Sequence, residues 1–164
     1  MARVYLLRHG IAVPHGTPGV PENERPLTPK GERRVAQIAR GLRLLGVQPD
    51  RVLTSPLPRA LKTAEIAAAE LDIEDRVDQV DVLRPGNTAE AIRDWLRSLG
   101  EVNVMLVGHN PNLTDLVGVL LGMPPGKLPF ELKKGGVAAF RTDPGGALRL
   151  QWVATPRLIR RLMR

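Results

Sequence analysis

The sequence predicts an α/β fold of three layers (α/β/α), with a mostly parallel central sheet and an antiparallel hairpin at its C-terminal edge. Short β-branched runs alternate with longer stretches of helical pattern along the chain. This alternation is typical of parallel strands that are joined by helices and covered on both faces. The last two expected strands are joined by the short polar turn RTDPGGAL, which favours an antiparallel hairpin.

The expected strands are short apolar runs, and the expected helices are longer periodic stretches. We expect strands over residues 2–7, 51–54, 102–107, 136–142 and 147–153, with a weaker one near 77–82. We expect helices over about 28–45, 56–71, 87–99 and 111–121. The final residues RLIRRLMR are expected to form a solvated, fraying end. With no repeat and no linker visible, residues 1–164 are expected to form a single domain.

Each expected helix carries a start signal in the sequence. The expected N-caps are polar side chains that accept a hydrogen bond from the first turn, and a proline follows three of them at the first helical position. These N-caps are Thr28, Ser55, Asn87 and Asn110, and the prolines are Pro29, Pro56 and Pro111. The run NTAE at 87–90 also resembles a capping box.

The composition excludes several classes of site. The chain has no cysteine, which excludes disulfides, thiolate metal ligands and cysteine nucleophiles. Its apolar runs are too short to span a bilayer and no secretory leader is visible, so we expect a cytoplasmic protein with no membrane partner. The net charge of +7 suits phosphate ligands, but aromatic residues make up only 3%, so a nucleic-acid partner is not expected.

Three short motifs place cationic side chains directly after expected strands. The first is Arg8-His9-Gly10, which follows the first strand. The second is TSPLPRA, which carries Arg59 into the first turn of the next helix, and the third is VGHNP, which carries His109. Ligands of open parallel sheets bind at the carboxyl ends of the strands. The three motifs therefore predict one shared site.

The residue types of these motifs suit a phosphoryl group. Two arginines give bidentate, charge-assisted contacts to phosphate oxygens, and a helix that begins near Asn110 points free N–H groups toward the same place. Arg59 reaches back over its strand end, because helical side chains lean toward the N-terminus. Gly10 permits a close backbone approach. Residues 11–27, rich in proline and glycine, are expected to form a long surface loop near this site.

The ordered set LLRHG, RPLTPKG, LTSPLPRALKTA and LVGHNP resembles the histidine phosphatase (phosphoglycerate-mutase-like) superfamily. Together with LRPGNT and the small size of the chain, the set is similar to the short phosphohistidine phosphatase branch of the SixA type. The resemblance covers about residues 3–116. Thr28 and Gly31 match an LTxxG block, for which we expect structural roles as a helix cap and as a small residue in the first helical turn.

The resemblance implies roles for five residues. His9 corresponds to the nucleophilic histidine that becomes phosphorylated, and Arg8 and Arg59 correspond to phosphate-binding arginines. His109 corresponds to a second histidine that contacts the transferred phosphoryl oxygens, and Ser55 lies beside the site. The implied reaction is a two-step phosphoryl transfer without a metal or another cofactor. Its rate is expected to fall at low pH as His9 becomes protonated.

The proton donor for the leaving group is less clearly marked. The larger superfamily members generally use a carboxylic acid, and the region VDQVDVLRPGNTAEAI offers Asp78 and Asp81, with Glu90 assigned to a helix start. We take Asp81 as the candidate. A site without a strong acid suits phosphohistidine better than sugar phosphates, because imidazole, with a conjugate-acid pKa of about 6.5, leaves more readily than an alkoxide. A phosphorylated protein is therefore the expected substrate.

Three alternatives remain open from the sequence. The same site could act on small phosphate esters of sugar or nucleotide type, as a phosphomonoesterase or a mutase. A metallohydrolase could use His9, His15 and His109 as zinc ligands. A binding module could use the arginines to hold phosphorylated partners without turnover. The oligomeric state cannot be read from the sequence.

Overall fold

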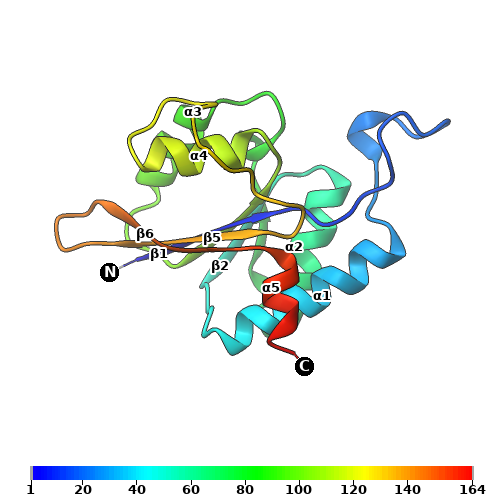
Figure 1. Ribbon diagram of the computed structural model, residues 1–164, viewed down its shortest axis with the longest axis horizontal. Coiled ribbons are helices and arrows are strands. Elements are labelled where there is room, and N and C mark those ends of the chain that lie inside the picture. Colours follow the sequence, from blue (N-terminus) through cyan, green and yellow to red (C-terminus); the bar gives the residue numbers. More distant parts are fainter. Residues whose placement is uncertain (1, 164) are drawn as a thin grey trace.

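The computed structural model describes residues 2–163 and contains a six-stranded sheet with helices on both faces (Figure 1). The strands are β1 (Arg3–Arg8), β2 (Arg51–Thr54), β3 (Val77–Gln79), β4 (Val104–Gly108), β5 (Val137–Thr142) and β6 (Leu148–Ala154). The helices are α1 (Pro29–Leu44), α2 (Pro58–Glu70), α3 (Ala89–Ser98), α4 (Asn112–Leu120) and α5 (Pro156–Arg161). Three short 3-10 turns are η1 (Glu22–Glu24), η2 (Glu74–Arg76) and η3 (Asp81–Leu83).

The sheet has the strand order β3-β2-β4-β1-β5-β6. The strands β1 to β4 pair in parallel, so their carboxyl ends lie at one edge of the sheet. The strands β5 and β6 form an antiparallel hairpin, and β5 pairs antiparallel with β1. The predicted three-layer α/β fold and its C-terminal edge hairpin are both confirmed.

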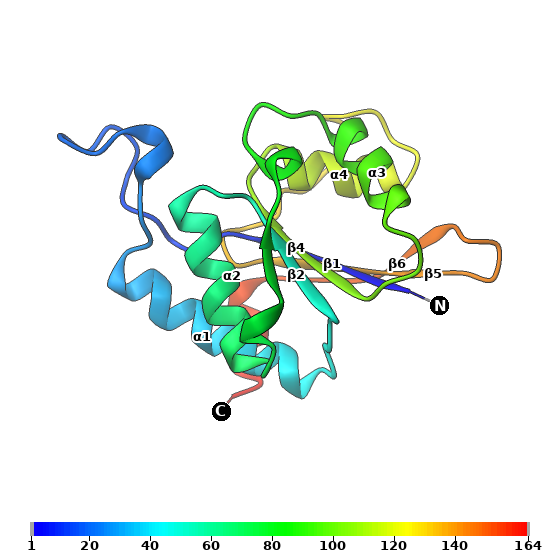
Figure 2. The same cartoon turned by 180° about the vertical axis from the view of Figure 1, so that it is seen from behind.

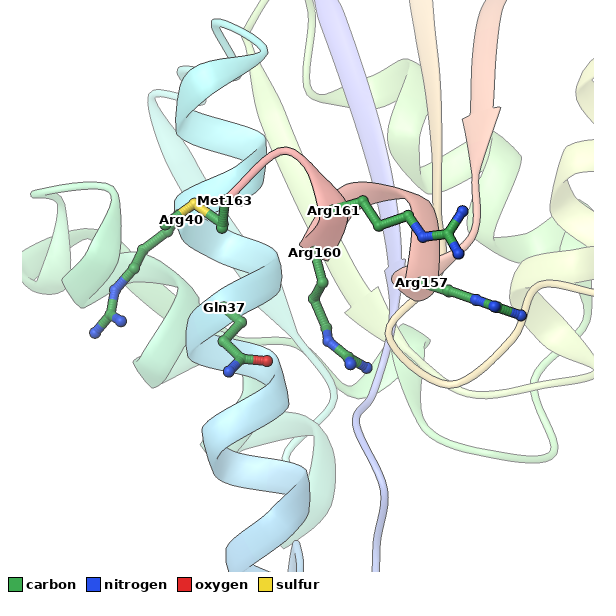
Figure 3. A pocket seen from close by; sticks show the side chains of 6 residues that line it. All are labelled: Gln37, Arg40, Arg157, Arg160, Arg161 and Met163. Carbon is green, nitrogen blue, oxygen red and sulfur yellow. The ribbon is translucent and has the colours of Figure 1, made fainter.

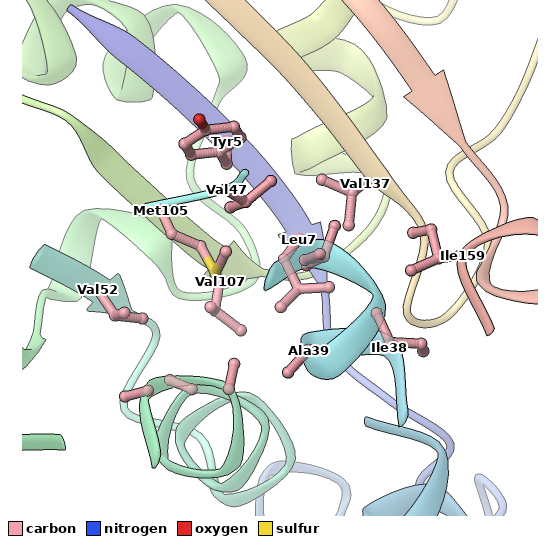
Figure 4. Close-up of a cluster of buried hydrophobic side chains, with 14 of the residues drawn as sticks. Tyr5, Leu7, Ile38, Ala39, Val47, Val52, Met105, Val107, Val137 and Ile159 are labelled. Atoms are coloured by element: carbon pink, nitrogen blue, oxygen red, sulfur yellow. The ribbon is translucent and has the colours of Figure 1, made fainter. Parts of the chain in front are cut away.

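The two faces of the sheet are covered by different helices. The helices α1, α2 and α5 pack on one face, and α3 and α4 pack on the other (Figures 1 and 2). Successive residues of β1 alternate between the two cores: Tyr5 and Leu7 point toward α1 and α2 (Figure 4), while Val4 and Leu6 point toward α3 and α4. Burial on both sides explains why the central strands are continuous apolar runs.

The predicted helix starts are right at one position and wrong at three. Thr28 caps α1, since its Oγ1 accepts the N–H of Gly31 at 2.9 Å. The helix α2 begins at Pro58, and not at Pro56 after a cap by Ser55. The cap of α3 is Thr88, whose Oγ1 accepts the N–H of Ala91 at 3.2 Å, so the cap lies one residue later than predicted and the capping box of Asn87 with Glu90 is not formed.

The remaining start, α4 at Asn112 instead of Pro111, shows why these predictions fail. The Oδ1 of Asn110 accepts from the backbone and hydroxyl of Thr114, and the amide of Asn87 donates to the carbonyls of Asp81 and Arg84. The hydroxyl of Ser55 contacts a buried histidine. The Asn110 side chain thus still accepts an N–H of the first turn of α4 although the helix starts later, whereas those of Ser55 and Asn87 bond elsewhere and cap neither α2 nor α3.

Gly31 and Gly41 lie where a side chain would collide with another segment of the chain. A Cβ atom at Gly31 would lie 2.1 Å from the carbonyl oxygen of Ile11, so glycine allows α1 to start against the chain that leaves β1. A Cβ atom at Gly41 would lie 2.6 Å from Ile159, which is fully buried. The expected small-residue role of Gly31 is thus confirmed.

The C-terminal residues form a helix, which corrects the prediction of a fraying end. Thr155 caps α5, because its Oγ1 accepts the N–H of Leu158 at 3.3 Å. Ile159 is the anchor of this short helix and lies against α1 (Figure 4). The expected strand at 77–82 is likewise shorter, because it ends at Gln79 and passes into η3. In the described part of the chain, no helix combines the length and apolar character that a bilayer crossing requires.

We expect Ile159→Ala to lower the free energy of unfolding by about 3 kcal/mol, because it removes a fully buried aliphatic side chain and leaves a cavity. Its neighbour Leu158 is 55% exposed, so Leu158→Ala serves as the matched control and should change stability by less than about 0.5 kcal/mol. Urea unfolding followed by circular dichroism measures both. Equal effects of the two substitutions would mean that α5 is not anchored through Ile159.

Candidate active site

Two histidines lie side by side at the carboxyl ends of β1 and β4. In the parallel register, Arg8 is opposite Gly108, and the N–H of His9 donates to the carbonyl of Gly108 at 3.0 Å. The imidazole of His9 and that of His109 follow these two residues, and their ring centroids are 5.3 Å apart. Both rings are almost fully buried. The sequence prediction that these strand ends share a site is therefore consistent with the geometry.

The ring of His9 is held in one orientation by its own neighbour. Its Nδ1 lies 2.7 Å from the carbonyl oxygen of Gly10, and because a carbonyl only accepts hydrogen bonds, Nδ1 carries the proton and donates. Gly10 is fixed in turn by its N–H, which donates to Thr63 Oγ1 at 3.0 Å, and by its close approach to Val35 of α1. In the neutral ring the lone pair is therefore on Nε2.

The ring of His109 is oriented by Ser55, which is completely buried. The two side chains meet through Nε2 and Oγ at 2.8 Å, and the same Oγ accepts the N–H of Leu57 at 3.3 Å. If Oγ also accepted from His109, its own buried hydroxyl would lack an acceptor, which is costly. The hydroxyl therefore donates to Nε2 and places the histidine proton on Nδ1. This Nδ1–H is buried and has no partner among the described residues.

Arg8 is held at one side of its guanidinium group only. Its Nη1 donates to Glu131 Oε1 at 2.9 Å and to the carbonyl of Leu132 at 2.8 Å. Its Nε is buried and has no partner in the described chain. The Nη1 end of the guanidinium group is thus hydrogen-bonded to the protein, while the Nε–H remains available to an oxyanion.

Arg59 repeats this arrangement from the opposite direction. Its Nη1 donates to the carbonyl of Glu22 at 3.0 Å, and its Nη2 lies 3.7 Å from the carboxylate of the same residue. Its Nε is also buried and, within residues 2–163, unpartnered. Two arginines on different elements therefore each keep an unused donor edge in a buried environment.

The loop 11–27 contributes residues that the sequence patterns missed. Glu22 lies in this loop, and its carboxylate accepts from Arg25 at 2.6 and 2.9 Å and from the ring of His15. The side chain of Arg25 is 12% exposed and donates also to the carbonyl of Val13. Beyond burial, which is the larger cause, the charge of Arg25 lowers the pKa of both Arg59 and His109. In the sequence, only the position of Arg25 directly before Pro26-Leu27-Thr28 could have marked it as a site residue. The path of the loop depends on tertiary contacts and cannot be predicted from its local sequence.

The electrostatics hold both histidines neutral. Burial lowers the pKa of His9 to about 3, and the charges of His109, Arg59 and Arg8 act in the same direction, against the hydrogen bond to the carbonyl of Gly10. Burial likewise lowers the pKa of His109 to about 3, with the charges of nearby arginines as the further cause. Burial also lowers the pKa of Arg8 and Arg59, but guanidinium groups stay charged at any physiological pH. The site therefore combines two cations with two neutral imidazoles.

Comparison of the sequence with known protein families identifies a match that begins in β1 and includes Arg8, His9 and Arg59. The family model described as Histidine phosphatase superfamily (branch 1) matches residues 4–84. The chain belongs to the histidine phosphatase superfamily. It is accordingly a phosphatase of the class that uses a histidine nucleophile.

Relatives in the superfamily match most of the chain. An uncharacterized protein from Picosynechococcus sp. is 38% identical over 152 residues, which cover 90% of this chain and 88% of the relative. Phosphohistidine phosphatase SixA of Escherichia coli is 27% identical over 158 residues, which cover 94% of both chains. A structure of the protein histidine phosphatase SixA complexed with tungstate superposes with a TM-score of 0.81 and 26% identity, over 94% of this chain and 97% of that one.

The structure does not bring Asp81 to the two histidines of this histidine phosphatase. The carboxylate of Asp81 is 86% exposed and pairs with Arg84 at 2.8 Å. Asp78, the other candidate, pairs with Arg51 on the surface of the sheet edge. The proton-donor prediction for Asp81 therefore gains no support from its position. The loop after η3 is still tied to the site, because the buried Asn112 donates to the carbonyls of residues 84 and 87.

The structure also separates His15 from the other two histidines. The side chain of His15 is 81% exposed and pairs with Glu22. Among residues 2–163, no three His, Cys, Asp or Glu side chains are grouped so that they could hold a metal ion. The predicted zinc alternative with His9, His15 and His109 therefore has no support in the geometry.

We expect the protein to lose stability as the pH falls from 6.5 toward 3. The pKa values of His9 and His109 are about 3 in the fold but about 6.5 in the unfolded chain, so the unfolded state binds more protons in this window. Each histidine then lowers the free energy of unfolding by up to about 1.4 kcal/mol per pH unit. Urea unfolding at pH 7.5 and 5.0 measures the difference.

Two variants serve as controls for this pH dependence. His9→Gln/His109→Gln should remove most of it, whereas His15→Ala, at an exposed position, should leave it unchanged. Carboxylates add little in this comparison, because carboxylates of the unfolded chain, with a pKa of about 4.3 or below, are also mostly charged at pH 5.0. A wild-type protein equally stable at both pH values would contradict the neutral buried pair.

We expect Ser55→Ala to reduce kcat by about tenfold with little change in KM, since it removes the hydroxyl that fixes the proton of His109 on Nδ1. The matched control is Thr54→Val, which removes the neighbouring buried hydroxyl that contacts only the backbone of residue 55. Steady-state kinetics of the purified variants measure both effects. An unchanged kcat in Ser55→Ala would show that the Ser55 hydroxyl does not control this ring.

Proposed function

We propose that this phosphatase hydrolyses phosphohistidine on a protein, through a phosphorylated His9 and without a metal ion. One observation carries the proposal: three buried N–H donors without an acceptor accompany a neutral imidazole at the same strand ends. The donors are Arg8 Nε, Arg59 Nε and His109 Nδ1. Buried donors are almost always paired, so their common state indicates an absent anionic acceptor. A tetrahedral oxyanion such as a phosphoryl group is an acceptor of the kind these donors require, and the related SixA was solved in complex with the oxyanion tungstate.

In the first step, the Nε2 lone pair of His9 attacks phosphorus in line with the bond to the leaving group. The ring becomes positively charged, and its Nδ1–H hydrogen bond to the carbonyl of Gly10 strengthens as this charge develops. The bond from phosphorus to the substrate nitrogen breaks, and its electron pair stays on the departing imidazole. When the other ring nitrogen of the substrate carries a proton, this imidazole leaves in its neutral form.

In the second step, water attacks the phosphorus of the phosphorylated His9, and the bond to Nε2 breaks to regenerate the neutral ring and inorganic phosphate. The charge on the equatorial oxygens is stabilised throughout by Arg8, Arg59 and His109. Because these groups are fixed before the substrate arrives, they need no reorganisation in the transition state.

The carboxylates support a substrate whose leaving group needs no strong acid. Glu131 and Glu22 both have a lowered pKa and are engaged with arginines, so neither is an acid at neutral pH. No carboxyl group in the described chain contacts His9 or His109. An alkoxide leaving group would require a proton in this site, whereas imidazole does not. A phosphoramidate substrate is therefore favoured over a phosphate monoester.

One observation favours a small phosphate ester as the second candidate substrate. A cavity of about 480 Å³ lies beside Arg8, and it is lined by Asn110, Pro111, Thr114, Asp115, Gly126, Leu128 and Glu131. This volume accommodates a small leaving group. Comparison of kcat/KM for a phosphohistidine protein and for phosphomonoesters discriminates the two. A strong preference for the monoesters would replace the first proposal with the second.

We expect a phosphorylated intermediate on His9. Intact-mass spectrometry after rapid quenching at neutral or alkaline pH should show an acid-labile phosphate adduct on the wild-type protein, and none on His9→Ala. His15→Ala is the matched control and should keep the adduct, because His15 is exposed on the loop. An equal amount of adduct on His9→Ala would contradict the assignment of His9 as the nucleophile. Binding of phosphate by the wild-type protein without any adduct would support a non-enzymatic binding module.

A further inference from the structure

A second cationic site lies between α1 and α5, apart from the candidate active site around His9 and His109. A cavity of about 400 Å³ is lined there by Gln37, Arg40, Arg157, Arg160, Arg161 and Met163, which we call the arginine pocket (Figure 3). Four of these six side chains are arginines, and none is a carboxylate. Neither the phosphatase reaction nor the packing of α5 through Ile159 uses Arg157 or Arg161 of this pocket.

The positive charge of the arginine pocket comes from α5. Arg40 on α1 is matched by Glu70, with two hydrogen bonds of 2.9 and 2.8 Å, and Figure 3 shows its guanidinium group turned away from α5. Arg157 and Arg161 are exposed, lie one helical turn apart, and contact no carboxylate in the part of the chain that the structure describes. These two charges are available to a partner.

The arginine pocket is joined to the catalytic strand end by the start of α5. The N–H of Gly135 donates to the carbonyls of Arg8 and His9 at 3.0 and 3.2 Å, and a Cβ atom on Gly135 would lie 3.6 Å from Pro156, the first residue of α5. Two exposed lysines, Lys133 and Lys134, directly precede this glycine. Cationic side chains therefore continue from the site to the pocket.

The distance between the two sites suits one protein partner. The cap of α1, Thr28, lies against Ile11 just beyond the catalytic motif, and Gln37 follows nine residues later, about 14 Å along the helix axis. A standard protein interface covers about 800 Å² on each partner, which is wide enough to extend from the start of α1 to the arginine pocket.

We propose that the arginine pocket docks an acidic segment of the phosphorylated protein substrate. The inference rests on the proposed action on a protein. The exposed Arg157 and Arg161, which contact no carboxylate of the described residues, favour glutamate and aspartate side chains, which arginine binds in a bidentate manner. No aromatic side chain lines the pocket, so it offers no platform for stacking nucleic-acid bases. Complementary charges at such a rim accelerate association and orient the partner.

The first test reverses the two exposed charges with Arg157→Glu/Arg161→Glu. We expect KM for a phosphohistidine protein to rise about five- to tenfold with kcat unchanged, since two favourable rim contacts become repulsive. Hydrolysis of a small phosphoramidate should be unaffected. The difference between wild type and variant should shrink at 0.5 M salt, because exposed charges are then screened.

The matched control is Arg3→Glu/Arg141→Glu, which changes the net charge equally at the opposite edge of the sheet, where these two exposed residues face each other across β1 and β5. This control should keep the wild-type KM. If it raises KM as much as the pocket variant, the effect comes from overall charge and the docking proposal fails. An equal loss with the small phosphoramidate would also overturn it, because the damage would then lie in the catalytic site.

A binding measurement separates docking from the choice of substrate. Fluorescence anisotropy with a labelled polyglutamate peptide should give a Kd that is at least about fivefold weaker for the pocket variant than for the control variant. Equal binding by both would reject the docking site even if the wild-type enzyme acts on phosphohistidine proteins. Tighter binding of a single-stranded oligonucleotide than of the peptide at this pocket would assign it to nucleic acid instead. Absence of protein phosphohistidine hydrolysis in the wild type, with peptide binding intact, would refute only the proposed function.

Discussion

The parallel pairing of β1 with β4 is the constraint on which the rest of the site depends. It sets Arg8 opposite Gly108, so the chain delivers one histidine from each strand to the same edge at a fixed spacing. The neighbouring strand β2 adds Ser55 at that edge, because its N–H donates to the carbonyl of Val107 at 3.0 Å. The backbone hydrogen bonds of the sheet thus position the two histidines and Ser55, and the loops add the partners of the arginines.

Burial gives this site its chemical character at a cost in stability. Removing imidazoles and guanidinium groups from water disfavours their charged forms, which keeps the histidines neutral and leaves the arginines dependent on partners. Glu22 and Glu131 supply those partners from two separate loops. Glu131 contacts Nη1 of Arg8 through its carboxylate, and Glu22 contacts Nη1 of Arg59 through its carbonyl, so both Nε donors stay unpartnered among the described residues. Stability and affinity for an anion are therefore provided by different atoms of the same side chain.

The sequence allowed the fold and the clustering of the candidate site residues to be predicted for one reason. Parallel strands with helical crossovers must end at a common edge, so topology brings Arg8, His9 and His109 to that edge, and Arg59 follows in the first turn of α2. Glu22, Arg25 and Glu131 could not be found this way, because their positions depend on loops whose path follows from tertiary contacts. Two helix caps failed for a related reason: Ser55 and Asn87 carry good capping side chains that bond to other groups of the fold. The helix α5 was missed because it is short and has one buried anchor, Ile159.

The divided use of each guanidinium group has a thermodynamic consequence for the loops. A loop that fixes an arginine favours the arrangement that receives phosphate, and by reciprocity bound phosphate must stabilise that loop by the same free energy. Segments 11–27 and 128–132 are then linked to one another through the ligand, although they touch different arginines. Binding of phosphate between Arg8 and Arg59 and ordering of these two loops are therefore thermodynamically coupled.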